Sequence, residues 1–315
     1  MKLSDLVDYS QQLNALDLND TQQESRRQLD RIMHVVTNHT LVSWPKMYKG
    51  LQQSSEQFDQ INRDIAHHIN TLRRHAQHLI EEMEPAYYTE STRVWTHEMA
   101  RDSNEKILCR AQKLVEQDRE MVMGKVLSWS DWRFPGLVIG PKNQEWVQHL
   151  VGLDPLYLVD QNLGLLDPTL KQFHEKYQQR LRLYAVNERQ HRPVLDALPE
   201  GQFSLIFAFD FFNYRPFEIV CKWLSELSQK LRPGGVLFFT FNDCDYAHGV
   251  ALAEANFMCY IPGRRIVEHM LQTDLELVNR GRGQNDFCWM QYAKPGTLQT
   301  MRAGQNLAKI VARSK

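Results

Sequence analysis

The stretch at residues 231–245, Leu-Arg-Pro-Gly-Gly-Val-Leu-Phe-Phe-Thr-Phe-Asn-Asp-Cys-Asp, constrains the fold more than any other part of this chain. A helix must end at Leu231, because residues 233–235 combine a proline, which cannot continue a helix, with two glycines that supply the positive φ of a tight turn. Residues 236–241 are, except for Leu237, β-branched or aromatic, which predicts a strand buried on both faces. The polar residues 242–245 then lie at its carboxyl end, the edge where open α/β sheets bind ligands.

Short apolar runs alternate with helix-like stretches after about residue 129, and this alternation indicates a parallel α/β sheet. Strands are predicted at residues 136–139, 156–159, 181–186, 204–209, 236–241, 275–278 and 287–292. Helices are predicted at residues 144–151, 170–179, 216–231, 250–256 and 264–271. Because residues 279–286 form a short, turn-rich connection, the last two strands should pair antiparallel.

A doubly wound sheet that closes with such a hairpin resembles the class I S-adenosylmethionine-dependent methyltransferases, whose last strand inserts antiparallel between its neighbours. The resemblance covers roughly residues 129–295, and the Leu-Arg-Pro-Gly-Gly turn is its most specific segment. It implies an α/β fold with a Rossmann-like, seven-stranded methyltransferase sheet, to which an N-terminal all-helical domain is attached.

The N-terminal domain is predicted from a sequence with few glycines and prolines and dense Gln, Glu, Arg and Leu. Its clearest helix spans residues 51–83, where apolar side chains recur at three- and four-residue steps, and Glu84-Pro85 should end it. Shorter helices are predicted at residues 21–36 and 103–121, giving a bundle or a hairpin. The apolar face of the long helix predicts a homo-oligomer or a protein partner.

The domain limits follow from these changes of pattern. We expect a helical domain at residues 1–127, a methyltransferase-like α/β domain at residues 128–297 and a C-terminal tail at residues 298–315.

Charge and hydropathy exclude few functions. The formal net charge of −1 gives no global argument for a nucleic acid partner. No apolar run approaches the roughly 20 residues that span a bilayer, and the first residues lack the apolar core of a signal peptide. Five scattered cysteines without a CxxC pair fit reduced thiols. We therefore expect a cytoplasmic protein without a membrane partner.

Four histidines between residues 67 and 78 resemble a metal cluster at first sight. Neighbouring helical positions point about 100° apart, and acid–histidine pairs on a solvated helix face need no metal. No metal site is expected.

The resemblance implies a cofactor site at the carboxyl edge of the first four strands. Asp160, at the end of the second strand, matches the acid that in this family accepts hydrogen bonds from the ribose hydroxyls, and a carboxylate suits two hydroxyl donors. Asn187 or Glu188 occupies the place of the adenine-contacting residue. Asp210 and Phe211 close the fourth strand, where the family places groups that face the methyl donor and the substrate.

The first loop departs from the family pattern. Gly140 can make the first turn, but Pro141 follows it and Val138 replaces the usual acid. The sequence leaves two explanations open, a divergent site that still binds S-adenosylmethionine or a fold that has lost its cofactor.

The methyl acceptor should lie beside the polar segment after residue 241. Asp243, Tyr246 and His248 are the predicted catalytic residues, and Asp243 or His248 could act as the base for an acceptor that carries a proton. In the structural alternative, Asn242 and Asp245 cap the predicted helix at residues 250–256. Cys244 is not expected to be a nucleophile, because two adjacent acids raise the pKa of its thiol.

The sequence as a whole predicts an S-adenosylmethionine-dependent methyltransferase of unknown acceptor. The alternative is a non-catalytic structural or assembly protein that retains the fold. The Asn-Asp-Cys-Asp strand end also resembles phage-encoded methyltransferase-like proteins, which would place the chain in a virion. A nicotinamide-dependent oxidoreductase is disfavoured because no GxGxxG follows the first strand.

Overall fold

A computed structural model of the chain describes most of its length. The described residues are 2–16, 23, 26–28, 30–31, 34, 44–95, 114–131, 133–141, 144–161, 170–171, 173–188, 194–284 and 288–295. Most of the predicted helix at residues 21–36, residues 103–113 of the predicted helix at 103–121, and the predicted tail at 298–315 lie outside them. The chain divides into two compact units, Met1–Pro85 and Ala86–Lys315. The domain limits expected at residues 127 and 297 stay predictions.

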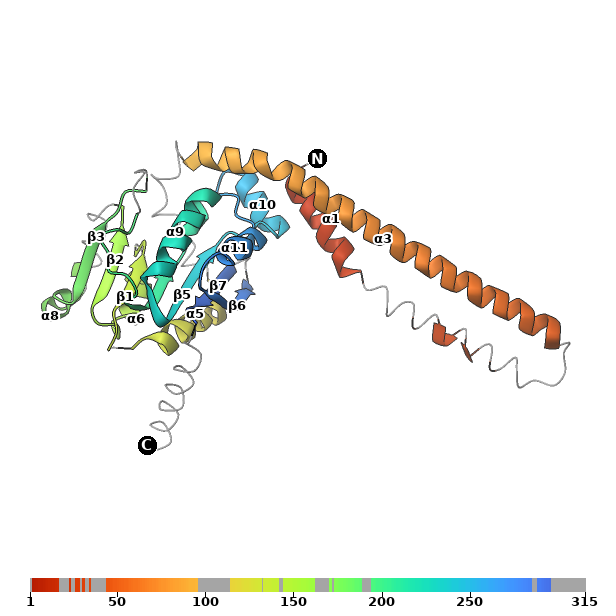
Figure 1. Cartoon of the computed structure of the whole chain (residues 1–315), viewed down its shortest axis with the longest axis horizontal. Coiled ribbons are helices and arrows are strands. Elements are labelled where there is room, and N and C mark those ends of the chain that lie inside the picture. Colours follow the sequence, from red (N-terminus) through yellow and green to blue (C-terminus); the bar gives the residue numbers. More distant parts are fainter. Residues whose placement is uncertain are drawn as a thin grey trace, which may run out of the picture. The chain divides into compact units, whose positions relative to one another are not determined.

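A seven-stranded sheet forms the centre of the second unit, in the order β3-β2-β1-β4-β5-β7-β6 (Figure 1). The strands are β1 (Gly136–Ile139), β2 (Leu156–Asp160), β3 (Leu181–Ala185), β4 (Phe203–Ala208), β5 (Leu231–Phe241), β6 (Glu276–Arg282) and β7 (Cys288–Ala293). The first five strands are parallel, and β7 pairs antiparallel with both β5 and β6. This is the predicted Rossmann-like methyltransferase sheet with its inserted last strand.

Helices cover both faces of this sheet. They are α5 (Glu116–Trp129), α6 (Gln144–His149), α8 (Glu175–Gln178), α9 (Phe217–Lys230), α10 (Ala247–Glu254) and α11 (Gly263–Met270). Alternate residues of β5 enter different cores: Phe239 belongs to the core that contains Trp223 of α9, whereas Phe238 belongs to the core that contains Val122 of α5 and Trp146 of α6. Because successive strand residues point to opposite faces, this alternation confirms the prediction that the strand is buried on both sides.

The Pro-Gly-Gly segment differs from its prediction, because it lies inside β5 and not before it. The pairing of β5 with β4 shifts register between Phe203 and Leu205, so residues 233–235 form an irregularity within the strand. Gly234 has the expected positive φ of 92°, but Gly235 is not among the residues with positive φ. Gly235 is required for another reason: a Cβ built there would lie 2.5 Å from the carbonyl oxygen of Phe203.

Two helices, α1 (Leu3–Ala15) and α3 (Trp44–Val94), provide most of the described residues of the first unit. The guanidinium of Arg73 on α3 donates two hydrogen bonds to the carbonyl oxygen of Leu13, of 3.0 and 2.7 Å, which joins the helices at the end of α1. The prediction that Glu84-Pro85 ends the long helix is wrong, since α3 continues through Pro85. The residues after Pro85 are stabilised by tertiary packing in the second unit, where Val94 is buried and the Ser91 hydroxyl accepts the N–H of Tyr260 at 2.9 Å.

Several predicted limits shift by a few residues. Within the helix predicted at 170–179, residues 170–171 are helical and α8 covers Glu175–Gln178, with a break at residues 173–174. Helix α5 ends at Trp129 and not at residue 121, and β6 extends through residues expected in the turn. Within the described residues, no helix has the length and hydropathy that crossing a membrane requires.

The two packing environments of glycine predict opposite effects of alanine. Gly235→Ala places a methyl group against the backbone of Phe203, so we expect a loss of about 1–3 kcal/mol in the free energy of unfolding. Gly124→Ala, in α5 with open space around its Cβ, should raise that free energy by about 0.5–1 kcal/mol. Urea unfolding of both variants measures the difference, and equal effects would contradict the close approach at Gly235.

Candidate functional site

The carboxyl edge of the parallel strands brings together the residues predicted for a cofactor site. Asp160 is the last residue of β2 and is buried, and Gly140 directly follows β1 with its N–H donating to the carbonyl oxygen of Val159 at 2.8 Å. Asp210 and Phe211 follow β4 after Phe209 and are also buried. Three neighbouring strands thus end in the positions that sequence analysis selects.

Gly140 has an unexpected neighbour in the ring of Phe211. Its φ is +62°, a conformation that favours glycine, and a Cβ built on it would lie 2.5 Å from Cδ2 of Phe211. The space that the missing side chain leaves is therefore occupied by a ring of the chain itself.

Phe211 is held by a buried ion pair. The guanidinium carbon of Arg215 lies 3.3 Å from the centroid of the Phe211 ring, and Arg215 Nε donates to Oε1 of Glu188 at 2.6 Å. The indole N–H of Trp223 donates to the same oxygen at 3.0 Å. Both partners of the ion pair are almost completely buried, so removing either would leave an uncompensated charge in the core. The cluster of Phe211, Arg215, Glu188 and Trp223 is called the Phe211 lock below.

Arg215 and Trp223 are not among the site residues predicted from the sequence. Phe211 and Arg215 flank the short 3₁₀ segment Phe212–Tyr214, so the mixture of aromatic and charged residues there was the available signal. The roles predicted for Asn187, which is exposed, and for Glu188, whose Oε1 accepts the two hydrogen bonds above, stay predictions.

Asp210 has a backbone conformation that is unusual for a residue with a side chain. Its φ is 50°, its N–H donates to the hydroxyl of Thr240 at 2.6 Å, and its Oδ1 accepts the Asn213 amide at 2.6 Å. A left-handed non-glycine residue persists only where its surroundings hold it, and such residues cluster at functional sites. The conformation turns the chain sharply at the end of β4.

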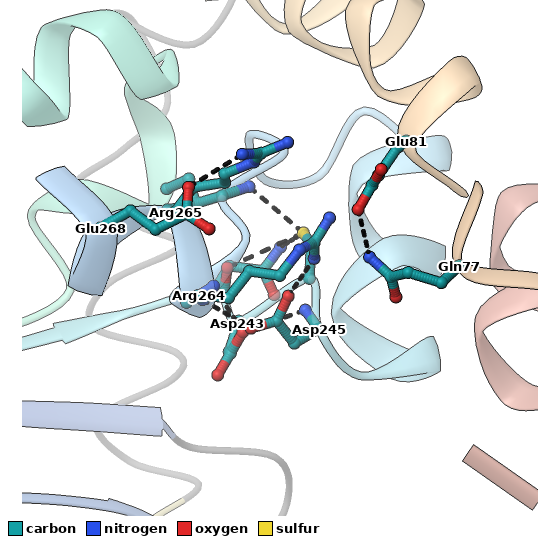
Figure 2. A network of polar contacts seen from close by, with 11 residues as sticks. Gln77, Glu81, Asp243, Asp245, Arg264, Arg265 and Glu268 are labelled. Atoms are coloured by element: carbon teal, nitrogen blue, oxygen red, sulfur yellow. Dashed lines mark hydrogen bonds and ion pairs between the residues drawn. The ribbon is translucent and has the colours of Figure 1, made fainter. Parts of the chain in front are cut away.

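The predicted acceptor segment after β5 forms a second cluster, built on the N-terminus of α11. Oδ1 of Asp243 accepts the N–H of Gly263 at 2.9 Å, and Oδ2 of Asp245 accepts the N–H of Arg264 at 2.6 Å. The side chain of Arg264 also forms an ion pair with Asp245, and Figure 2 shows the two carboxylates beside this arginine. Two carboxylates thus stabilise the positive end of one helix dipole.

This arrangement corrects the expected helix cap. Asn242 and Asp245 do not cap the helix that follows in sequence: α10 begins after Tyr246, and its N-cap has no side-chain hydrogen bond. The Asn242 amide instead donates to the carbonyl oxygens of Gly249 and Cys259, at 2.9 and 3.2 Å. The acids after β5 reach across to α11 because Asp243 forms a parallel bridge with Ile261, which precedes that helix.

Burial changes the acidity of both carboxyl groups. The pKa of Asp243 is raised by burial, against opposing hydrogen bonds from backbone N–H groups. Burial, followed by the negative charge of Asp243, raises the pKa of Asp245 to about 7. The arginines of β6, Arg280 and Arg282, favour the ionised form of Asp243.

The other predicted catalytic residues lie near this cluster. The guanidinium carbon of Arg282 lies 4.3 Å from the centroid of the Tyr246 ring, and His248 is exposed on the first turn of α10. Cys244 is buried, and the pKa of its thiol is raised well above the ordinary value, first by burial and then by Asp243 and Asp245. Such a thiol is a poor nucleophile. The catalytic roles of Asp243, Tyr246 and His248 stay predictions.

The histidines of α3 are exposed, and His78 forms an ion pair with Glu82 at 3.3 Å. Among the residues described above, no group of three or more His, Cys, Asp or Glu side chains is placed to hold a metal ion.

No protein-family model matches the chain, and no curated protein matches it. Similar solved structures include geranyl diphosphate C-methyltransferase from Streptomyces coelicolor A3(2), with 11% identity, a TM-score of 0.46, and coverage of 62% of this chain and 84% of that one. An S-adenosylmethionine-dependent methyltransferase from Clostridium acetobutylicum ATCC 824 has 13% identity, a TM-score of 0.46, and coverage of 60% and 95%. The N-methyltransferase NodS from Bradyrhizobium japonicum WM9 has 17% identity, a TM-score of 0.45, and coverage of 65% and 99%. At these identities the similarity is one of fold alone.

The pKa of Asp245 predicts a pH dependence of stability. A carboxyl whose pKa rises from 3.8 to about 7 on folding stabilises the native state below the lower value, and that contribution is lost as pH rises through about 7. We expect the free energy of unfolding to fall by about 1–3 kcal/mol between pH 5 and pH 8. Asp245→Asn should reduce this fall in urea unfolding, whereas Asn at the exposed Asp196 should keep the wild-type slope. If the free energy of unfolding of Asp245→Asn falls more steeply with pH than that of the wild type, Asp245 is not the source of the pH dependence.

Proposed function

We propose that this chain is an S-adenosylmethionine-dependent methyltransferase whose acceptor is unknown. The observation that carries the proposal is the buried carboxylate of Asp160 at the end of β2, in a seven-stranded sheet with an inserted antiparallel β7. The family that the sequence resembles uses an acid at this strand end for the ribose hydroxyls. When bound, the cofactor would supply a methyl group activated by a sulfonium.

The carboxylates at this edge of the sheet suit the adenosyl group, but the ring of Phe211 would have to move before a ligand could reach Gly140. The carboxylates of Asp160 and Asp210 are acceptors for hydroxyl and ammonium donors. The position beside Gly140, by contrast, holds the ring of Phe211, so a ligand that approaches the backbone there must displace the ring. We propose that Asp160 binds the ribose and that the Phe211 lock covers the glycine turn.

The acceptor is proposed to bind at the carboxyl end of β5. Methyl transfer requires an acceptor lone pair aligned with the sulfonium, and a base where the acceptor carries a proton. The imidazole of His248 is exposed to solvent and suits this role better than Asp243, whose carboxylate already accepts two backbone N–H groups. Tyr246 is proposed to contact the acceptor beside Arg282.

The N-terminal unit is proposed to mediate association with a second copy or with a protein partner, through the apolar face of α3. A cytoplasmic location is proposed as well, because the cysteines of the described residues, Cys221, Cys244, Cys259 and Cys288, are thiols and not disulfides. The filled space at Gly140 favours one alternative, a non-catalytic assembly protein that retains the fold.

Binding of S-adenosylhomocysteine, the demethylated product, tests the function. In isothermal titration the wild-type chain should bind, and Asp160→Asn should weaken binding about tenfold or more, which corresponds to about 1.4 kcal/mol. Asp154→Asn is the matched control, because Asp154 precedes β2 at its other end and forms a half-exposed ion pair with Arg180. If the folded wild-type chain binds neither this ligand nor S-adenosylmethionine at millimolar concentration, the enzymatic proposal fails and the assembly role is favoured.

A second variant tests the movement of Phe211. Phe211→Ala removes the ring that covers Gly140, so we expect tighter binding of S-adenosylhomocysteine than in the wild type, by about fivefold. Phe209→Ala is the matched control: this ring is equally buried but packs on the opposite face of the sheet against Trp146. Each truncation lowers stability by about 3–5 kcal/mol, so titrations are made well below the unfolding temperature of both variants. Weaker binding in Phe211→Ala alone would make the ring part of the ligand site.

A further inference from the structure

A stripe of apolar side chains remains exposed along α3. Large apolar residues occur at every seventh position of this helix, namely Leu51, Phe58, Ile65, Leu72 and Leu79. Ile65, Leu72 and Leu79 are 45%, 43% and 41% exposed, and Ile61, on the same side, is 56% exposed. Phe58, in line with them, is half-buried. We call Phe58, Ile61, Ile65, Leu72 and Leu79 the α3 seam.

The buried side of α3 is a different one. Ala76 and Ile80 are buried, and Arg73, which holds the end of α1, lies on their side of the helix. Successive positions of a helix are 100° apart, so Leu79 and Ile80 point in different directions, and this accounts for exposures of 41% and 5%. The α3 seam is thus additional to the surface that packs within the unit.

The spacing of the seam indicates what it contacts. A straight helix drifts relative to a seven-residue repeat, so a strict repeat over several heptads is typical of a helix that winds around another helix of the same period. Within a heptad, Ile61, His68 and His75 occupy the positions between the main apolar residues. The repeat therefore has one set of positions that is entirely apolar, and a second set in which one isoleucine alternates with two histidines.

The charges of α3 favour an antiparallel partner with the same sequence. Within residues 55–66, Glu56 and Asp64 stand against Arg63, while Asp59 already pairs with Arg26 at 2.6 Å. Residues 67–78 contain no acid: they carry Arg74 and four histidines, besides Arg73, which is bonded to the carbonyl oxygen of Leu13. In a parallel pair of identical helices each stretch would face its own like charges. In an antiparallel pair the acidic stretch of each helix faces the basic stretch of the other.

We propose that the α3 seam binds a second copy of this chain in an antiparallel two-helix coiled coil. Ile65 would then face His68 of the second copy, Leu72 would face Ile61 and Phe58 would face His75. Each histidine would then pack against an apolar side chain of the second chain, and not against the same histidine of that chain. The two-fold relation makes the same surface serve both chains. The inference rests on the association proposed above for the N-terminal unit and names its partner and its surface.

Light scattering after size exclusion of the full chain tests the seam. The wild type should be a dimer, and the double substitution Ile65→Glu with Leu72→Glu should give a monomer. The matched control is Asn70→Glu with Gln77→Glu, which adds the same charge at the same spacing on exposed positions of the opposite face and should stay dimeric. Circular dichroism checks that the helix content of the variants is equal, and added salt should weaken the wild-type dimer.

Cysteine substitutions test the direction of the helices. Chains carrying Ile65→Cys mixed with chains carrying His68→Cys should form a disulfide between the two kinds of chain, identified by peptide mapping. A disulfide that joins two Ile65→Cys chains to each other through the introduced thiol would make the pair parallel and overturn the proposed register.

The outcomes separate the seam from association in general. If the variant with Ile65→Glu and Leu72→Glu stays oligomeric like the wild type, the chain associates through another surface, which overturns the seam alone. A monomeric wild type overturns the association itself, and a lowered melting temperature in its seam variant would mean that another segment of the same chain covers α3. Neither outcome affects the cofactor proposal, which is measured by titration.

Discussion

The burial of β5 on both faces is the constraint on which the second unit depends. Phe239 and Phe241 enter the core under α9, while Val236 and Phe238 enter the core under α5 and α6. A strand of this kind must have a neighbour on each edge and a helix layer on each face, since an exposed edge or face would leave apolar surface and unpaired backbone groups in water. Strand β4 fills one edge and the returning β7 fills the other.

Much of this arrangement can be predicted from sequence, because it depends on local pattern. The alternation of apolar runs and helical stretches predicts the parallel strands, and the turn-rich segment after residue 278 predicts the antiparallel pairing of β6 and β7. The continuation of α3 through Pro85 could not be predicted, because local propensity opposes it and contacts such as that between Ser91 and Tyr260 are far apart in sequence.

The polar residues after β2 and β4, and those after β5, show the same limit of prediction from sequence at the candidate site. Strand ends identify Asp160, Asp210 and Asp243 by position alone, since every polar residue there is placed by the strand before it. What each carboxylate contacts depends on residues that arrive from elsewhere. Asp243 meets the N-terminus of α11, which is twenty residues later, and Phe211 covers Gly140, which follows another strand. Sequence therefore locates the candidate residues, whereas their partners require the tertiary structure.

The hydroxyl of Thr240 gives the sheet a further property. It accepts the N–H of Asp210, so a side chain of β5 fixes the residue at which β4 turns away. The register between paired strands sets which residues lie opposite each other. A shift of β5 by one residue relative to β4 would point Thr240 to the opposite face of the sheet. The position of the turn after β4 therefore depends on the register between β4 and β5. Natural variation at position 240 should be confined to side chains that can accept the N–H of Asp210.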